Sequence, residues 1–185
     1  MKTLVTKRLI LRGLKLSDVD DFYAYAKKPN IGPMAGWAPH TSIQHAYEIL
    51  KMMIKENEVW GITLKKEDRI IGTIGLHVRN FDNALSNQKE MGYVIDEPYW
   101  GQGYTPEAVE AVLDYAFMTL ELTQVLCGHA TNNPQSEKVI KKSGFSFTHQ
   151  EVREHYDHTN ITINMYALTR DQYKEWKHDK LKNKI

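Results

Sequence analysis

Residues 91–118 read M-G-Y-V-I-D-E-P-Y-W-G-Q-G-Y-T-P-E-A-V-E-A-V-L-D-Y-A-F-M, and this stretch decides the fold. It begins with aromatic and β-branched residues at Tyr93–Ile95, which is typical of a strand. It ends with apolar residues at helical spacing. Between them lies the turn Gly101–Thr105, with Thr105 as the predicted N-cap and Pro106 as the first helical residue. A glycine turn before a helix presents free N–H groups and the positive end of the helix dipole, so the stretch predicts an anion site suited to phosphate.

The glycine turn also has a plainer interpretation, because such a turn is often only a tight connection between two elements. The dinucleotide-binding fingerprint is excluded, since Pro106 occupies its third glycine position. The phosphate loop of nucleotide hydrolases is excluded too, because no Gly-Lys-Ser/Thr follows the turn. Considered by itself, the turn leaves the phosphate site and the simple connection both open.

Length and composition indicate one ordinary domain. The chain has 185 residues, 42% of them hydrophobic and 25% charged, which argues against a disordered or membrane-spanning protein. Its formal net charge of +1 argues against nucleic acid as a partner. Met1–Ile10 lacks the apolar core of a signal peptide, so we expect a cytoplasmic protein. Cys127, the only cysteine, is expected to be a buried structural thiol. We expect a single domain over residues 1–178 and a basic tail over residues 179–185.

The order of the predicted elements indicates a layered α/β domain with a mixed sheet. Strands are expected at Leu4–Leu14, Glu58–Leu64, Arg69–Val78, Lys89–Ile95, Thr123–Ala130, Phe145–His155 and Asn160–Leu168. Helices are expected at Asp18–Lys27, from Thr41 or Ser42 to Lys55, at Thr105–Leu120, from Asn133 or Pro134 to Lys142, and at Arg170–Lys177. A loop spans residues 29–39 and a polar connection spans residues 81–87. A strand, a helix and a strand in this order form a right-handed crossover, so the strands on either side of the central helix should be parallel.

Two further motifs accompany the glycine turn. Residues 6–12 read T-K-R-L-I-L-R and precede Asp18. Residues 133–145 read N-P-Q-S-E-K-V-I-K-K-S-G-F, with an Asn and a Ser three apart before Gly-Phe. With residues 92–108, these motifs resemble the GNAT N-acetyltransferase superfamily, and more narrowly its ribosomal-protein N-terminal acetyltransferase branch, over nearly the whole chain. The resemblance implies the acyl-CoA N-acyltransferase fold, a mixed and mostly antiparallel sheet of about seven strands flanked by helices.

The resemblance implies acetyl-CoA as the co-substrate, without a metal. The coenzyme A pyrophosphate would lie on the turn, the pantetheine arm would pair with the preceding strand, and the short second motif would also contact coenzyme A. The residues so implied are Gln102, Gly103, Tyr104, Thr105, Tyr93, Val94, Asn133 and Ser136. Trp100 and Thr105 depart from the usual pattern, which has Gln or Arg and Gly or Ala there. As an alternative, Asn133 only caps the short helix, with Ser136 in its first turn.

Three residues are candidates for catalysis. The substrate amine arrives protonated, since its pKa is about 8 for an α-amino group and about 10.4 for Lys. Glu90 resembles a catalytic Glu of some family members and could receive the proton, although it could equally be a solvated carboxylate at a strand end. His77 on the neighbouring strand is a second candidate base, or a simple sheet residue. Ser136 could protonate the departing thiolate, as the family suggests.

The amine acceptor is the least defined part of the site. Met34, Trp37, His40 and Tyr47 are expected to shape its pocket, because the equivalent segment does so in the family. A protein N-terminus would need an open groove, whereas a small-molecule amine would fit a closed pocket. The chain could be a monomer or a homodimer. A different class of function also stays open, that of a catalytically silent acyl-CoA-binding sensor or structural protein.

Two histidines near a predicted hairpin turn, His155 and His158, invite a metal-binding interpretation. No third ligand with metal spacing accompanies them in the sequence. We therefore expect exposed hairpin residues and no metal site. Three lysines of the second motif, Lys138, Lys141 and Lys142, could attract a phosphate of coenzyme A or form a solvated helix face.

Overall fold

The computed structural model describes residues 1–78 and 87–182, so most of the predicted connection at 81–87 lies outside the described residues. The α-helices are α1 (Val19–Ala26), α2 (Ile43–Glu56), α3 (Tyr104–Met118), α4 (Pro134–Lys142) and α5 (Arg170–Lys182). The strands are β1 (Leu4–Val5), β2 (Leu9–Gly13), β3 (Val59–Leu64), β4 (Ile70–His77), β5 (Gln88–Ile95), β6 (Gln124–Ala130), β7 (Ser146–Glu154) and β8 (Asn160–Thr169). Short 3-10 helices are η1 (Leu16–Asp18), η2 (Pro33–Ala35) and η3 (Glu97–Tyr99).

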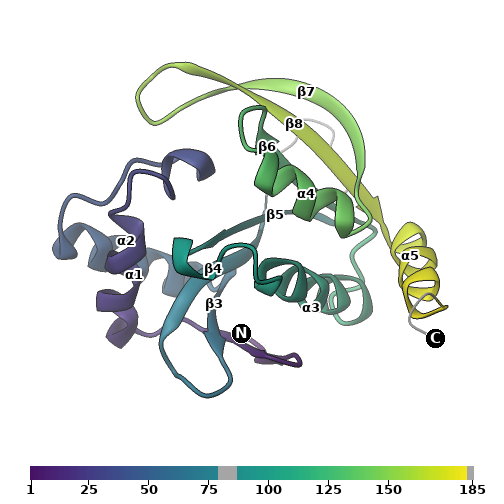
Figure 1. Cartoon of the computed structure of the whole chain (residues 1–185), viewed down its shortest axis with the longest axis horizontal. Coiled ribbons are helices and arrows are strands. Elements are labelled where there is room, and N and C mark those ends of the chain that lie inside the picture. The colour runs from purple at the N-terminus through teal and green to yellow at the C-terminus, as the bar shows by residue number, and fades with distance from the viewer. Residues whose placement is uncertain (79–86, 183–185) are drawn as a thin grey trace.

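Within the described residues, the strands form one eight-stranded sheet in the order β1-β2-β3-β4-β5-β6-β8-β7. Neighbouring strands are antiparallel except β5 and β6, which are parallel and joined through α3. In Figure 1, α1 and α2 lie on one side of the sheet, and α3 and α4 lie on the other. The mixed, mostly antiparallel sheet flanked by helices, expected from the sequence, is confirmed.

The two faces of the sheet carry separate hydrophobic cores. One core packs α3, α4 and α5 against the sheet, and its fully buried members include Val112, Leu113 and Met91. The other packs α1 and α2, with Phe22 and Leu50 at its centre. Because both faces are covered, the central strand β4 is buried along nearly its whole length. The sheet is therefore a well-packed support for the residues at its edges.

Several predicted boundaries were wrong. The opening strand is divided, because the chain doubles back at Thr6: its amide donates to the Leu9 carbonyl (3.0 Å) and its hydroxyl accepts from the Leu9 amide (2.9 Å). The central helix begins at Tyr104, with Gly103 and not Thr105 as its N-cap. The last helix continues beyond Lys177 to Lys182, since Lys177 and Lys180 form ion pairs with acidic residues of α3.

Candidate active site

The site begins where two parallel strands separate. The register of β5 and β6 runs from Gln88 opposite Gln124 to Met91 opposite Cys127 and ends there. Beyond that point β5 stays paired with β4, and β6 stays paired with β8. Among the described residues, no strand pairs with the β6-facing edge of Gly92–Ile95. This separation opens a cleft of about 700 Å³ between the two strands.

One end of the cleft is the glycine turn at the start of α3. Gly101 and Gly103 have φ of 72° and 76°, the left-handed region in which glycine avoids steric cost. Gly103, Tyr104 and Thr105 line the cleft, as predicted for the phosphate site. Gln102 does not line it, because its side-chain amide donates to the Pro98 carbonyl (2.8 Å). The end of the cleft therefore combines a helix N-terminus with a backbone shape that anions favour.

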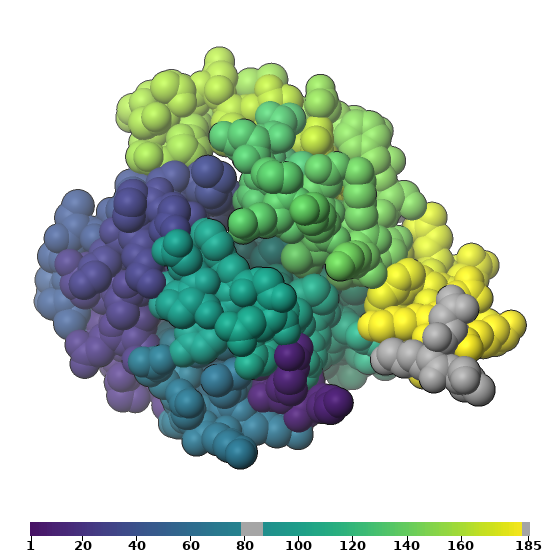
Figure 2. All heavy atoms as spheres, in the orientation of Figure 1, coloured from purple at the N-terminus to yellow at the C-terminus, as the bar shows by residue number. Residues whose placement is uncertain are grey.

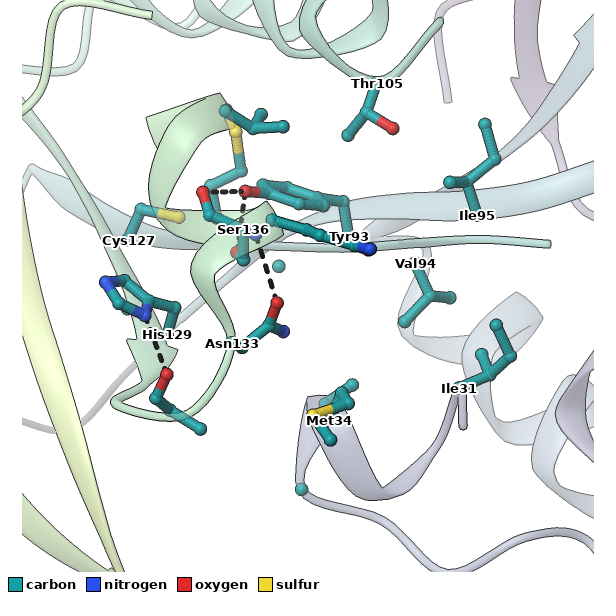
Figure 3. Close-up of a pocket in the computed structure, with 18 of the residues that line it drawn as sticks. Ile31, Met34, Tyr93, Val94, Ile95, Thr105, Cys127, His129, Asn133 and Ser136 are labelled. Atoms are coloured by element: carbon teal, nitrogen blue, oxygen red, sulfur yellow. Dashed lines mark hydrogen bonds between the residues drawn. The ribbon is translucent and has the colours of Figure 1, made fainter. Parts of the chain in front are cut away.

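The opposite wall is the N-terminus of α4. Asn133 caps this helix by accepting a hydrogen bond from the Ser136 amide (3.1 Å). Both residues also line the cleft. The hydroxyl of Ser136 lies 2.9 Å from the hydroxyl of Tyr93, which comes from the free edge of β5 (Figure 3). Burial raises the pKa of Tyr93 well above its ordinary value, so this hydroxyl keeps its proton.

Lysines of α4 add positive charge beside this wall. Lys138 and Lys142 line the cleft and are exposed. Lys141 instead pairs with Glu137 (2.6 Å) one helical turn away. Cys127, also on the cleft wall, is buried, and burial raises the pKa of its thiol. It is the structural thiol that the sequence predicted, since a protonated buried thiol is a poor nucleophile.

Glu90, the predicted base, lies in the cleft but is ion-paired. Its carboxylate accepts from Arg153 of β7 at 3.1 Å, and its side chain is 15% exposed. Arg153 also pairs with Glu151 on its own strand. His77, the other candidate, does not line this cleft; its Nδ1 lies 3.6 Å from the Glu58 carboxylate, beside a shallow hollow that it shares with Glu90. The structure brings Glu90 and Ser136 to the same cleft and leaves His77 outside it.

Of the residues predicted to bind the amine acceptor, some line the cleft and others do not. Met34 lines the cleft from the loop before α2, whereas Trp37 and Tyr47 do not. Trp37 instead packs over Gly32, where an added Cβ would lie 2.4 Å from the indole ring. His40 is buried against Trp37, with ring centroids 5.1 Å apart. Trp37 and His40 therefore shape the loop that presents Met34.

Residues of the terminal hairpin, β7 and β8, also line the cleft. No local sequence motif predicted them. Arg153, His155, Ile161 and Ile163 line it. His155 is not the exposed residue that the sequence predicted: its side chain is 11% exposed, and Nε2 lies 3.0 Å from the Pro33 carbonyl of the loop. This contact joins the hairpin to the loop, and in Figure 2 the light green atoms of the hairpin rest against the purple atoms of that segment.

The described residues bear on two further classes of function, metal binding and membrane insertion. His158 is exposed, and its Nδ1 lies 2.6 Å from the Glu154 carboxylate. Within residues 1–78 and 87–182, no group of three or more His, Cys, Asp or Glu side chains has a metal-binding arrangement. In the same part of the chain, every helix is too short or too polar to cross a lipid bilayer.

Comparisons with known proteins agree with this geometry. A family model described as the acetyltransferase (GNAT) domain matches residues 8–146. The uncharacterized N-acetyltransferase p20 of Bacillus licheniformis is 28% identical over 181 residues, which is 94% of this chain and 99% of the relative. The ribosomal-protein-serine acetyltransferase of Escherichia coli is 34% identical over 80 residues, 43% of each chain. A crystal structure of a GNAT-family acetyltransferase from Bacillus anthracis superposes with a TM-score of 0.82 at 19% identity, over 92% of this chain and 99% of that one.

The fold and the cleft thus define an acyltransferase of the N-acetyltransferase class. The chain belongs to the GNAT acetyltransferase family, and its relatives include ribosomal-protein acetyltransferases.

Proposed function

We propose that the protein transfers the acetyl group of acetyl-CoA to a primary amine by direct attack, with both substrates bound in the cleft at once. The separation of β5 and β6 carries this proposal, since it places a free strand edge, a helix N-terminus and Glu90 along one cleft. The buried Cys127 thiol, protonated at neutral pH, supports direct attack over an acetylated cysteine.

The residues present fit coenzyme A. The free edge of Gly92–Ile95 offers N–H and C=O groups at the spacing that an extended pantetheine amide arm needs. The backbone amides at Gly103–Thr105 suit the pyrophosphate, and Asn133 with Ser136 closes the other wall. Lys138 and Lys142 supply positive charge for a further phosphate. When bound, acetyl-CoA supplies an already activated thioester, so the protein must position groups and move protons.

The proton that the amine loses and the proton that the sulfur gains each have a candidate residue. Glu90 would take the proton of the amine, directly or through a water molecule, while Arg153 holds its carboxylate in place. The backbone N–H groups near Tyr93 would stabilise the charge that develops on the acetyl oxygen. The hydroxyl pair of Tyr93 and Ser136 would give a proton to the departing sulfur. His77 has no part in this scheme, because its ring lies outside the main cleft.

The test is amine-dependent release of free thiol. Purified protein would be incubated with acetyl-CoA and small linear amines or peptides with a free N-terminus, and calorimetry with coenzyme A would run in parallel. We expect release only when an amine is present. We also expect Ser136→Ala and Glu90→Gln to lower kcat by about tenfold or more, because each removes a proton-transfer group. Lys7→Ala, an exposed change outside the cleft, is the matched control.

The alternatives give different results in the same assay. Binding of coenzyme A without release by any amine would favour the silent sensor or structural protein. Full kcat in both Ser136→Ala and Glu90→Gln would remove their assignment to proton transfer. Failure to bind coenzyme A would remove the proposed function altogether.

A further inference from the structure

Arg8, in the turn between β1 and β2, contacts the glycine turn at the start of α3. Its Nη1 donates to the Gln102 carbonyl (2.8 Å). Its guanidinium lies over the Tyr104 ring, 4.4 Å from the ring centroid. Its Nη2 approaches Gly103 so closely that an added Cβ would lie 3.4 Å from it. One side chain from the start of the chain therefore touches three successive residues of the predicted phosphate site.

The other side of Arg8 is held by Glu107 in the first turn of α3. The Glu107 carboxylate accepts from Arg8 Nε (2.6 Å), from the Arg8 amide (2.7 Å) and from the Thr6 hydroxyl (2.6 Å). Burial by itself would raise the pKa of Glu107, but these hydrogen bonds outweigh it and lower the pKa. Both carboxylate oxygens are thus occupied by donors from the opening hairpin.

The contact between Arg8 and the Gln102 carbonyl favours one orientation of the Gln102–Gly103 peptide. In a trans peptide, the carbonyl oxygen and the following N–H point in opposite directions. Because Arg8, which does not line the cleft, holds the Gln102 carbonyl, the Gly103 amide is directed away from Arg8, and Gly103 itself lines the cleft. In the absence of this contact, Gly103 on one side of the peptide would let it rotate at lower cost than a residue with a side chain.

Arg8 also changes the charge at this helix end. A carboxylate in the first helical turn competes with a bound anion for the positive end of the helix dipole. The ion pair with Arg8 compensates the charge of Glu107, so the N-terminus of α3 keeps its attraction for a phosphate.

We propose that Arg8 is a positioning residue for coenzyme A, which fixes the Gln102–Gly103 peptide with its amide toward the cleft and cancels the charge of Glu107. The proposal rests on the proposed function, because it concerns the same coenzyme A site. Arg8 does not line the cleft, so it acts through the turn and not by touching the reacting atoms.

The experiment compares Arg8→Met, Arg8→Lys and the neighbouring Lys7→Ala by calorimetry with coenzyme A and with pantetheine, which lacks the pyrophosphate. We expect Arg8→Met to weaken coenzyme A binding about tenfold and to leave pantetheine binding within about twofold. Arg8→Lys should recover part of the loss, because it keeps the charge and one donor. Lys7→Ala should match the unchanged protein.

A second comparison isolates the charge of Glu107. Adding Glu107→Gln to Arg8→Met should recover affinity for coenzyme A about threefold, since the uncompensated carboxylate is then gone. In the transfer assay, Arg8→Met should raise KM for acetyl-CoA and leave kcat within about twofold.

Three outcomes would overturn the proposal. The first is equal coenzyme A affinity in Arg8→Met and Lys7→Ala. The second is an equal loss of pantetheine affinity, which would indicate general damage to the cleft. The third is kcat falling as much as kcat/KM. If the unchanged protein binds coenzyme A but transfers no acetyl group, the proposed function fails and the titrations still decide the role of Arg8.

Discussion

Glu90 and Ser136 lie in one cleft, yet their functional atoms have different partners. The Glu90 carboxylate is ion-paired with Arg153, whereas the Ser136 hydroxyl lies beside the hydroxyl of Tyr93. A pattern of residue types identifies both side chains as candidates but cannot say which group each one contacts. The roles of these two residues therefore depend on partners from β7 and β5, which only the folded chain brings together.

His40 shows how burial affects stability at the scale of one residue. It packs against the rings of Phe22 and His45, and among the described residues its Nδ1 has no hydrogen-bond partner. Burial, with the nearby His45, lowers the pKa of His40 from 6.5 to about 4. Between these two values the unfolded chain binds more protons than the folded one, so stability falls as the pH decreases from about 6.5 to about 4.

We therefore predict that His40→Phe flattens the pH dependence of unfolding. The substitution keeps the aromatic contacts and removes the titrating group, so its advantage should grow toward pH 4, to on the order of 2 kcal/mol. Urea unfolding of both proteins at several pH values between 4 and 7 measures this difference. Parallel curves for the two proteins would contradict the prediction.

At the scale of elements, the terminal hairpin and the loop before α2 form one enclosure. The His155 ring is held on its other side by Asp157, whose own carboxylate accepts from the Thr159 amide (3.1 Å) and hydroxyl (2.6 Å). The carbonyl of Pro33 can only accept, so His155 donates to it from Nε2. An ordered turn thus presents a donor to the loop across the part of the cleft that we propose for the amine acceptor.

We predict that His155→Ala alters use of the amine and not of acetyl-CoA. Loss of the contact frees the hairpin from the loop, so KM for the amine should rise about fivefold, while KM for acetyl-CoA stays within about twofold. His158→Ala removes an exposed histidine of the same turn and is the control. Steady-state kinetics with each substrate varied in turn measures the effect. Equal KM values for the amine in the two variants would contradict a role of the His155 contact in binding the amine.

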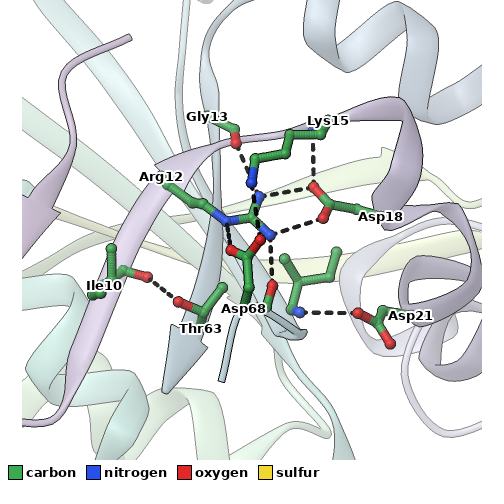
Figure 4. Close-up of polar contacts among 9 residues, drawn as sticks. Ile10, Arg12, Gly13, Lys15, Asp18, Asp21, Thr63 and Asp68 are labelled. Atoms are coloured by element: carbon green, nitrogen blue, oxygen red, sulfur yellow. Dashed lines mark hydrogen bonds and ion pairs between the residues drawn. The ribbon is translucent and has the colours of Figure 1, made fainter. Parts of the chain in front are cut away.

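At the scale of the whole molecule, a partly buried charge network joins distant parts of the chain. Arg12 of β2 donates to both oxygens of Asp18 (2.8 and 2.9 Å) and to the Asp68 carboxylate (2.6 Å), as Figure 4 shows. Arg12 and Asp18 are 9% and 4% exposed. Asp18 also accepts from the Lys15 amide (2.7 Å). The network therefore joins β2, η1 and the turn between β3 and β4.

We predict that Asp18→Ala is strongly destabilising, because it leaves the buried Arg12 charge without its main partner. The expected loss is about 3 kcal/mol in the free energy of unfolding. Asp68→Ala removes a partner whose side chain is 70% exposed, so its effect should be much smaller. Urea denaturation of the two variants compares them directly, and equal losses would show that burial is not the deciding factor.

Much of the fold was predictable because its signals are local. Each predicted α-helix overlaps an observed one, and the residue types around Asn133 indicated the cap of α4 as one interpretation. Two of the errors fell where distant contacts set the boundary. The opening strand divides at Thr6, which Glu107 contacts, and α5 is extended by ion pairs with α3.

The sequence by itself determined the strand–turn–helix at residues 91–118 and, through three local motifs, the membership of a known family, because each motif consists of residues close together in the chain. Only the tertiary structure decided which distant residues meet in and around the cleft. Arg8 reaches Gln102, Arg153 reaches Glu90, and His155 reaches Pro33, over separations of 94, 63 and 122 residues. Such contacts leave no periodic trace in the sequence, because the sheet order and the path of the hairpin bring these residues together.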